Sequence, residues 1–128
     1  DDVLAQKEVI EREDLLDRPL LLSRQAIAKT SGNNDFVAWF GNAFDRLNIV
    51  ATYNLVYNAA VFAENNIGYL VSLKGLYNGG DTSSLLYKHL SPKLESKLVL
   101  AWKRNPVFSP AAQLFLVRLR ELLAQSRD

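Results

Sequence analysis

Short predicted strands alternate with longer helical segments along the first part of the chain. The strands fall at 20–22, 48–52 and 69–71, and the segment 55–64 is apolar nearly all round. Apolar runs of strand length that end at turn residues are typical of a buried parallel sheet, whereas an apolar segment of about ten residues is typical of a buried helix. The order strand, helix, strand predicts an α/β fold, with an open, mainly parallel sheet flanked by helices.

Asparagines stand where two of the predicted helices begin. Asn34, or Asp35 next to it, precedes a segment with an apolar face, and Asn54 directly precedes the helix 55–64. Because an asparagine side chain can accept a hydrogen bond from the unpaired N–H groups of a first turn, we expect both helices to be capped in this way. We expect the helix 55–64 to be buried on more than one side and to end where Asn65 or Asn66 adopts a left-handed conformation.

The last part of the chain predicts one more strand and one more helix. The strand 98–102 ends before Pro106, and Ser109 is placed to cap a helix with Pro110 at its first position. The apolar stripe of this helix keeps helical spacing through Ala112, Phe115, Leu116, Leu119, Leu122 and Leu123. A stripe of this kind needs a covering surface, so we expect it to pack on the chain's own sheet or on a second copy.

Composition and charge exclude several classes of protein. The chain is 48% hydrophobic and 23% charged, and no apolar run approaches the length of a membrane span. Its net charge of +1 includes no dense polybasic run, so we expect no direct binding to nucleic acid and no association with a membrane. The acidic pair Asp1-Asp2 is the reverse of a cationic leader, which leaves a cytoplasmic protein or one whose leader has been removed.

The residues that carry catalytic chemistry are scarce. There is no cysteine and only one histidine, His89, and a lone histidine is more often a surface residue than a catalyst. Gly79-Gly80 lacks the spacing and the following helix of a dinucleotide-binding loop. We therefore expect neither an enzyme nor a protein with a metal or other cofactor.

Several motifs occur in the order found in one family of regulators. Glu13-Asp14-Leu15 precedes Pro19-Leu20-Leu21, a helix and glycine-flanked strand follow over 59–71, and the chain closes with Trp102-Lys103 and the segment 109–119. In this order and spacing the chain resembles the C-terminal, effector-binding part of LysR-type transcriptional regulators. The resemblance covers essentially the whole chain, although no single motif is diagnostic alone.

The resemblance implies half of a type II periplasmic-binding-protein-like domain, in which two α/β subdomains enclose a cleft. Residues 1–96 correspond to regulatory subdomain II. Residues 97–128 correspond to the return strand and C-terminal helix that normally complete subdomain I. The winged helix-turn-helix of the family and most of subdomain I have no counterpart in this sequence, so the chain is expected to carry half of an effector site.

The resemblance also implies which residues line that half-site, because the family uses the residues just past the strands of subdomain II. Here these are Ser23, Arg24, Gln25, Thr52, Tyr53, Asn54 and Ser72. Hydroxyl and amide groups beside a helix N-terminus suit a carboxylate or another small anion, and an arginine can add a bidentate contact. The alternative is that Asn54 only caps its helix, that the serines only end strands and that Arg24 is solvated. Ser72-Leu73-Lys74 replaces the proline that many relatives carry after this strand.

The resemblance therefore implies an effector-sensing domain fragment of a bacterial, cytoplasmic LysR-type regulator. Its expected partners are a small anionic metabolite, further copies of the same chain in a dimer or tetramer, and DNA only through an absent N-terminal domain. A solute-binding protein of a transporter shares this architecture and is the main alternative. A third reading is an interaction module whose apolar helices serve only assembly.

Overall fold

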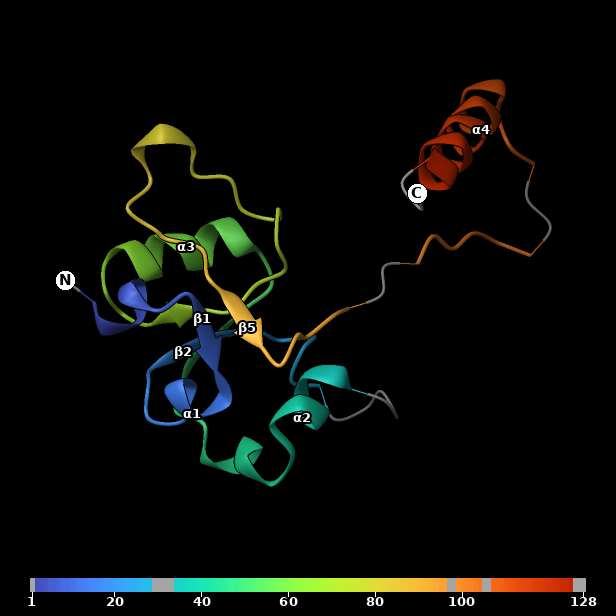
Figure 1. Ribbon diagram of the computed structural model, residues 1–128. Helices are drawn as coiled ribbons and strands as arrows, with labels where there is room; N and C mark the ends of the chain where they lie inside the picture. The colour runs from blue at the N-terminus through green and yellow to red at the C-terminus, as the bar shows by residue number, and fades with distance from the viewer. Residues whose placement is uncertain (1, 29–33, 97–98, 105–106, 126–128) are drawn as a thin grey trace. The chain divides into compact units, whose positions relative to one another are not determined.

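The computed structural model describes residues 2–28, 34–96, 99–104 and 107–125, and it divides the chain into two compact units (Figure 1). Unit 1 covers residues 1–96 and unit 2 covers residues 97–128. The elements of unit 1, in chain order, are η1 (Val3–Gln6), β1 (Val9–Glu11), α1 (Arg12–Leu15), β2 (Leu20–Ser23), α2 (Asp35–Phe40), η2 (Gly41–Arg46), β3 (Ile49–Tyr53), α3 (Val56–Glu64), β4 (Tyr69–Leu70), η3 (Gly80–Thr82) and β5 (His89–Ser91). Unit 2 contains α4 (Pro110–Gln125).

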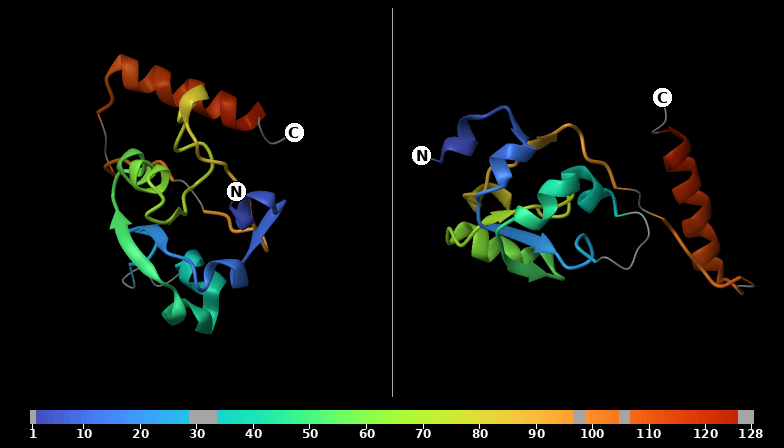
Figure 2. Two further views of the ribbon diagram at one scale, coloured as in Figure 1. Left: turned by 90° about the vertical axis from the view of Figure 1, so that its left-hand side faces the viewer. Right: turned by 90° about the horizontal axis from the view of Figure 1, so that it is seen from below.

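The main sheet of unit 1 has three parallel strands in the order β3-β2-β4. The central strand β2 carries Leu20, Leu21 and Leu22, and all three side chains are buried. Leu20 and Leu22 pack with the aromatic residues of α2, whereas Leu21 lies on the face that α3 covers. The two helices therefore cover opposite faces of the sheet (Figures 1 and 2), and a central strand buried on both faces explains the uninterrupted leucine run.

A second sheet pairs the first and last strands of unit 1. β1 and β5 are parallel, with Ile10 opposite Leu90. β5 has three residues and ends directly before Pro92. Ile10 is buried in the same core cluster as Leu20 and Leu22, so both sheets share one hydrophobic core.

Helix α2 begins as the sequence predicts, with an asparagine cap. The Oδ1 atom of Asn34 accepts hydrogen bonds from the backbone N–H groups of Phe36 (3.1 Å) and Val37 (3.2 Å). The helix is shorter than its apolar pattern, because Gly41 takes a positive φ of 54° and Phe44 lies in the following 3-10 segment η2. Trp39 is buried in the core cluster and donates its indole N–H to the carbonyl oxygen of Pro92.

Helix α3 differs from its prediction at its N-terminus and in its burial. It begins at Val56 with Leu55 as the N-cap residue, and no side chain caps it, so the prediction that Asn54 caps this helix is wrong. The prediction of burial on several sides is also wrong, since only Ala59 and Ala60 are buried. The physical reason is that the sheet covers one face of α3 and leaves its outer face to solvent. The C-terminus is as predicted, with Asn66 at a φ of 59°.

Unit 2 has the predicted helix but not the predicted strand. Ser109 accepts a hydrogen bond at its Oγ atom from the backbone N–H of Ala112, which is the expected cap of α4. Of the predicted strand 98–102, Leu98 lies outside the described residues, and residues 99–102 form no strand. A strand needs a partner for its N–H and C=O groups, and none of the described residues of unit 2 supplies one. No described residue of α4 is buried, and among the other described residues of unit 2 only residues 100–102 and Phe108 lie against its apolar stripe, at Ala112, Phe115 and Leu116.

The fold of unit 1 is thus mixed α/β, with short parallel sheets flanked by helices. Among the residues that the structure describes, no helix combines the length and the apolar character needed to cross a membrane.

Candidate functional site

The candidate site is an open pocket at the point where β3 of the main sheet ends and α3 begins. Its volume is about 350 Å³. It is lined by the end of β3, the two residues that connect β3 to α3, one residue of β2 and one face of α3: Leu21, Ala51, Thr52, Tyr53, Asn54, Leu55, Asn58, Ala59 and Phe62. In open parallel sheets ligands bind outside the carboxyl ends of the strands, and this pocket occupies that position.

The local sequence explains why the pocket is open. β3 is one of the two edge strands of the sheet, and only Asn54 and Leu55 separate it from α3, so the helix starts close to the strand end. Ala51 and Ala59 are small and keep the space between strand and helix free of bulk. Leu55 and Phe62 are 66% and 48% exposed and supply an apolar wall. The pocket therefore combines apolar walls with the polar residues of the strand end.

Three polar side chains of the pocket have unused hydrogen-bonding capacity. Thr52, Asn54 and Asn58 are exposed, and none of their side chains forms a hydrogen bond to another described residue. Beside them lies the N-terminus of α3, where the first N–H groups of a helix lack partners within the helix and where Leu55 provides no side-chain cap. Amide, hydroxyl and backbone donors at one helix N-terminus can together hold a carboxylate or another oxyanion.

Tyr53 plays a different part from its neighbours. Its hydroxyl donates a hydrogen bond to the carbonyl oxygen of Val71, at 2.7 Å, and the side chain is half-buried. Burial raises the pKa of this phenol above its ordinary value of 10.0, so the hydroxyl keeps its proton at neutral pH. The ring lines the pocket, while the hydroxyl is bound to the residue that follows β4, the strand on the far side of β2.

The remaining residues of the predicted site lie outside the pocket lining. Ser23 pairs with Tyr53 at the end of β2, and the backbone N–H of Arg24 donates to the carbonyl oxygen of Tyr53 at 2.9 Å. The side chains of Arg24 and Gln25 are exposed in the turn that follows, and Ser72 donates from its Oγ atom to the carbonyl oxygen of Leu73. The structure thus brings only Thr52, Tyr53 and Asn54 of the predicted residues into one pocket.

Sequence reasoning missed the other lining residues of the pocket, among them Leu55, Asn58 and Phe62. Asn58 follows Asn54 by four residues, a separation that places two side chains on one side of a helical turn, and this spacing was the available signal. Leu55 and Phe62 gave no such signal, because an apolar residue in a helix is more often part of the core.

Metal ligands and the single histidine are the other groups that could carry chemistry. Across the described ranges there is no group of three or more histidine, cysteine, aspartate or glutamate side chains that could hold a metal ion. His89 is exposed on β5 and makes an edge contact with the ring of Tyr87.

Comparison of the chain with protein-family models, with curated proteins and with solved structures gives no match. The functional argument therefore depends on the pocket itself and on the pattern of motifs in the sequence.

Proposed function

We propose that this chain is an effector-sensing domain of a LysR-type transcriptional regulator, in which the pocket beside β3 and α3 binds a small anionic metabolite. Binding is relayed to a DNA-binding domain that lies outside this sequence, and the segment described here makes no contact with DNA. Unit 1 takes the part of regulatory subdomain II, and unit 2 takes the part of the segment that completes subdomain I.

The observation that carries the proposal is the convergence of unused polar groups on one apolar pocket. Thr52, Asn54 and Asn58 have no hydrogen-bond partner among the described residues, and the first turn of α3 has no side-chain cap. Groups of this kind gain most when a charged oxygen replaces the water around them, because hydrogen bonds to ionised acceptors are about twice as strong as neutral ones. Leu55 and Phe62 supply contact for an apolar body on the same ligand.

The topology of the main sheet supports the comparison with a periplasmic-binding-protein-like half-domain. In the order β3-β2-β4 the strand that comes first in the chain is central, and the next two strands lie on either side of it. This is a doubly wound arrangement, which creates a switch point at the carboxyl end of the first strand. The pocket includes Leu21 of that strand together with the end of β3.

We also propose that the protein works as a homo-oligomer, a dimer or a tetramer. Unit 2 supports this proposal because large apolar side chains of α4 are exposed within it, among them Leu114, Phe115 and Leu122. Exposed apolar surface of this extent is typical of proteins that assemble.

The test is a titration of the ¹⁵N-labelled chain with benzoate, followed by amide chemical shifts, with uncharged benzamide as the matched ligand. We expect benzoate to shift the amides of residues 52–58, with a Kd on the order of millimolar because one open wall cannot exclude water, and benzamide to bind more weakly. Asn58→Ala should raise the benzoate Kd roughly tenfold, since a hydrogen bond to a charged group contributes about 1.5–3 kcal/mol. Asn42→Ala, at an exposed position outside the pocket, should leave it unchanged.

Equal affinities for benzoate and benzamide, or shifts scattered over unit 1 with none at residues 52–58, would refute an anion site at this pocket.

A further inference from the structure

The hydroxyl of Tyr53 spans the carboxyl end of the main sheet. Tyr53 is the last residue of β3, and its Oη atom lies 2.7 Å from the carbonyl oxygen of Val71, the residue that follows β4. β3 and β4 are not neighbours, because β2 lies between them. One side chain therefore connects the two outer strands across the central one.

On the β4 side this bond is made past the regular pairing of the sheet, whereas Tyr53 itself still pairs with Ser23 of β2. The register of β2 with β4 stops at Leu21 opposite Leu70, and beyond it the backbone N–H of Val71 still donates to the carbonyl oxygen of Leu21 at 3.1 Å. The carbonyl group of Val71 itself lies past the last strand pair. A half-buried carbonyl without a partner costs free energy, so the phenol hydroxyl stabilises the end of β4 as well as the end of β3.

On these observations we infer that Tyr53 is a positioning residue of the pocket: its hydroxyl fixes the end of β3, and with it Thr52 and Asn54, and does not contact the ligand. The inference rests on the proposed function, since a positioning role has meaning only if the pocket binds. It separates Tyr53 from its two neighbours, whose side chains have no partner among the described residues and remain available to a ligand.

The geometry makes this role specific. Thr52 and Asn54 flank Tyr53 in sequence, so a movement of the Tyr53 backbone displaces both pocket residues at once. Shifts of a few tenths of an ångström are enough to weaken hydrogen bonds from such groups to one oxyanion, because these bonds depend steeply on distance and angle.

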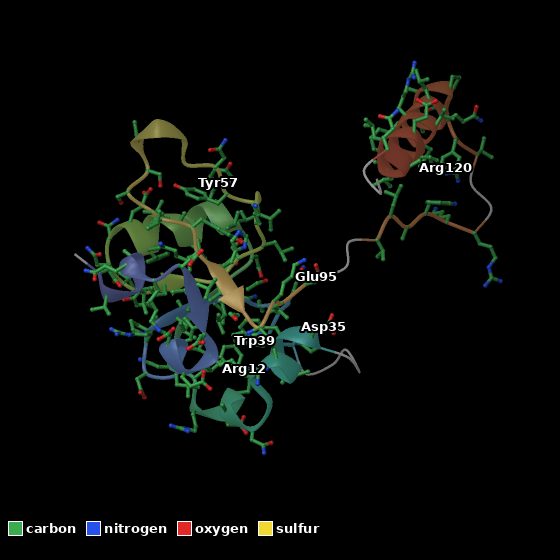
Figure 3. All side chains as sticks on the ribbon, in the orientation of Figure 1. Arg12, Asp35, Trp39, Tyr57, Glu95 and Arg120 are labelled. Atoms are coloured by element: carbon green, nitrogen blue, oxygen red, sulfur yellow. The ribbon has the colours of Figure 1, made fainter. Side chains whose placement is uncertain are left out.

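The test uses Tyr53→Phe, which removes the hydroxyl and keeps the ring, in the whole 128-residue chain. Tyr57→Phe is the matched control, because Tyr57 is 56% exposed on α3 and its hydroxyl makes no hydrogen bond to a described residue (Figure 3). Two quantities are measured: amide hydrogen exchange of the ligand-free chain, and the Kd for benzoate at a temperature where far-UV circular dichroism shows each variant fully folded.

We expect Tyr53→Phe to speed exchange at the amides of Arg24 and Val71, whose N–H groups donate to the carbonyl oxygens of Tyr53 and Leu21 at the two strand ends. It should leave the amide of Leu21 protected and raise the benzoate Kd about threefold to tenfold. Tyr57→Phe should change neither quantity. Unchanged exchange at Arg24 and Val71 overturns the inference whether or not benzoate binds. Faster exchange with an unchanged Kd overturns it too, because the bond would then serve stability alone.

The two proposals fail in different ways. If the unaltered chain binds no benzoate, the proposed anion site fails at this pocket, and the positioning role fails with it even where exchange is faster. If the unaltered chain and Tyr53→Phe bind benzoate equally well, the pocket function stands and the role of Tyr53 is refuted.

Discussion

Gly68, directly before β4, allows the main sheet to form, and replacing it with alanine should destabilise unit 1. A Cβ atom at this position would lie 2.7 Å from the carbonyl oxygen of Pro19 and 3.2 Å from the Cγ2 atom of Val50. The same Pro19 oxygen accepts the hydrogen bond from the backbone N–H of Tyr69, at 2.7 Å. The added methyl group therefore meets backbone that cannot rotate away, at the first contact between β4 and β2.

The magnitude follows from three terms. Overpacking against a fixed neighbour costs about 1–3 kcal/mol. Lengthening the bond from Tyr69 to Pro19 costs about 1 kcal/mol. Alanine lowers the conformational entropy of the unfolded chain, which stabilises the folded state by about 0.4–1 kcal/mol. The net loss is about 2 kcal/mol, which for a unit of this size lowers Tm by about 8–16 °C.

Urea unfolding and a thermal scan, both followed by circular dichroism, measure this loss. The matched control is Gly75→Ala, because a Cβ at Gly75 meets no atom within 4 Å, although its φ of 81° strains an alanine by about 1 kcal/mol. Gly68→Ala should therefore lose more stability than Gly75→Ala, and it should also lose amide protection at Tyr69 and Val71. A Tm for Gly68→Ala at or above that of Gly75→Ala would refute the steric argument.

Two further changes probe the core and the acid stability of unit 1. Leu22→Ala should lower the free energy of unfolding by about 2–5 kcal/mol, because the side chain is 1% exposed in the shared core. Leu55→Ala, at a side chain that is 66% exposed, should lower it by less than about 1 kcal/mol. Equal losses in urea unfolding would contradict this core assignment. The ammonium group of Lys7, which donates to Asp14 at 2.6 Å, lowers the pKa of that carboxyl below 3.8, so its stabilising contribution is present above pH 3.8 and is lost as the pH falls through the lowered value. Asp14→Asn should flatten the Tm profile between pH 5 and about pH 2, and an unaltered profile would count against this bond.

Most of unit 1 could be predicted from local patterns. The leucine run of β2 indicated a strand buried on both faces, and the structure confirms a parallel sheet around it. The chemistry of helix ends, which acts over only a few positions, predicted a cap at Asn34 or Asp35 and a left-handed residue at Asn65 or Asn66. In the structure these are Asn34 and Asn66. These predictions succeed because their physical cause lies within the same short segment.

The predictions that failed needed knowledge of distant neighbours. Residues 99–102 have the composition of a strand, but strand formation requires a partner for each backbone group, and composition does not reveal one. The burial of α3 was mispredicted for a similar reason. The pattern of apolar residues in a helix shows which faces could be buried, but it does not show whether another element packs on each face, and the outer face of α3 is exposed. β1 was not predicted, because Val9–Glu11 is short and forms a strand only through its pairing with β5.

The sequence predicted the position of the candidate site, but not most of the residues that line it. The resemblance implied seven residues at the ends of parallel strands, and the structure brings only Thr52, Tyr53 and Asn54 of these into one pocket. The side-chain roles could not be read from the sequence, because the bond between Tyr53 and Val71 crosses a strand that intervenes in space. Asn58 entered the site through the start of α3, which lies one residue later than the position of Asn54 suggested.

The pairing of β1 with β5 has a consequence for how the protein is made. During synthesis β1 leaves the ribosome near the start of unit 1, and its partner follows only close to the end of that unit. The strands of the main sheet emerge between them and can pair in the order of their synthesis, but the smaller sheet waits for the last strand. Until then the nascent chain exposes Ile10 and the adjoining core residues to water. This interval, rather than the finished fold, is when a chaperone would have most to protect.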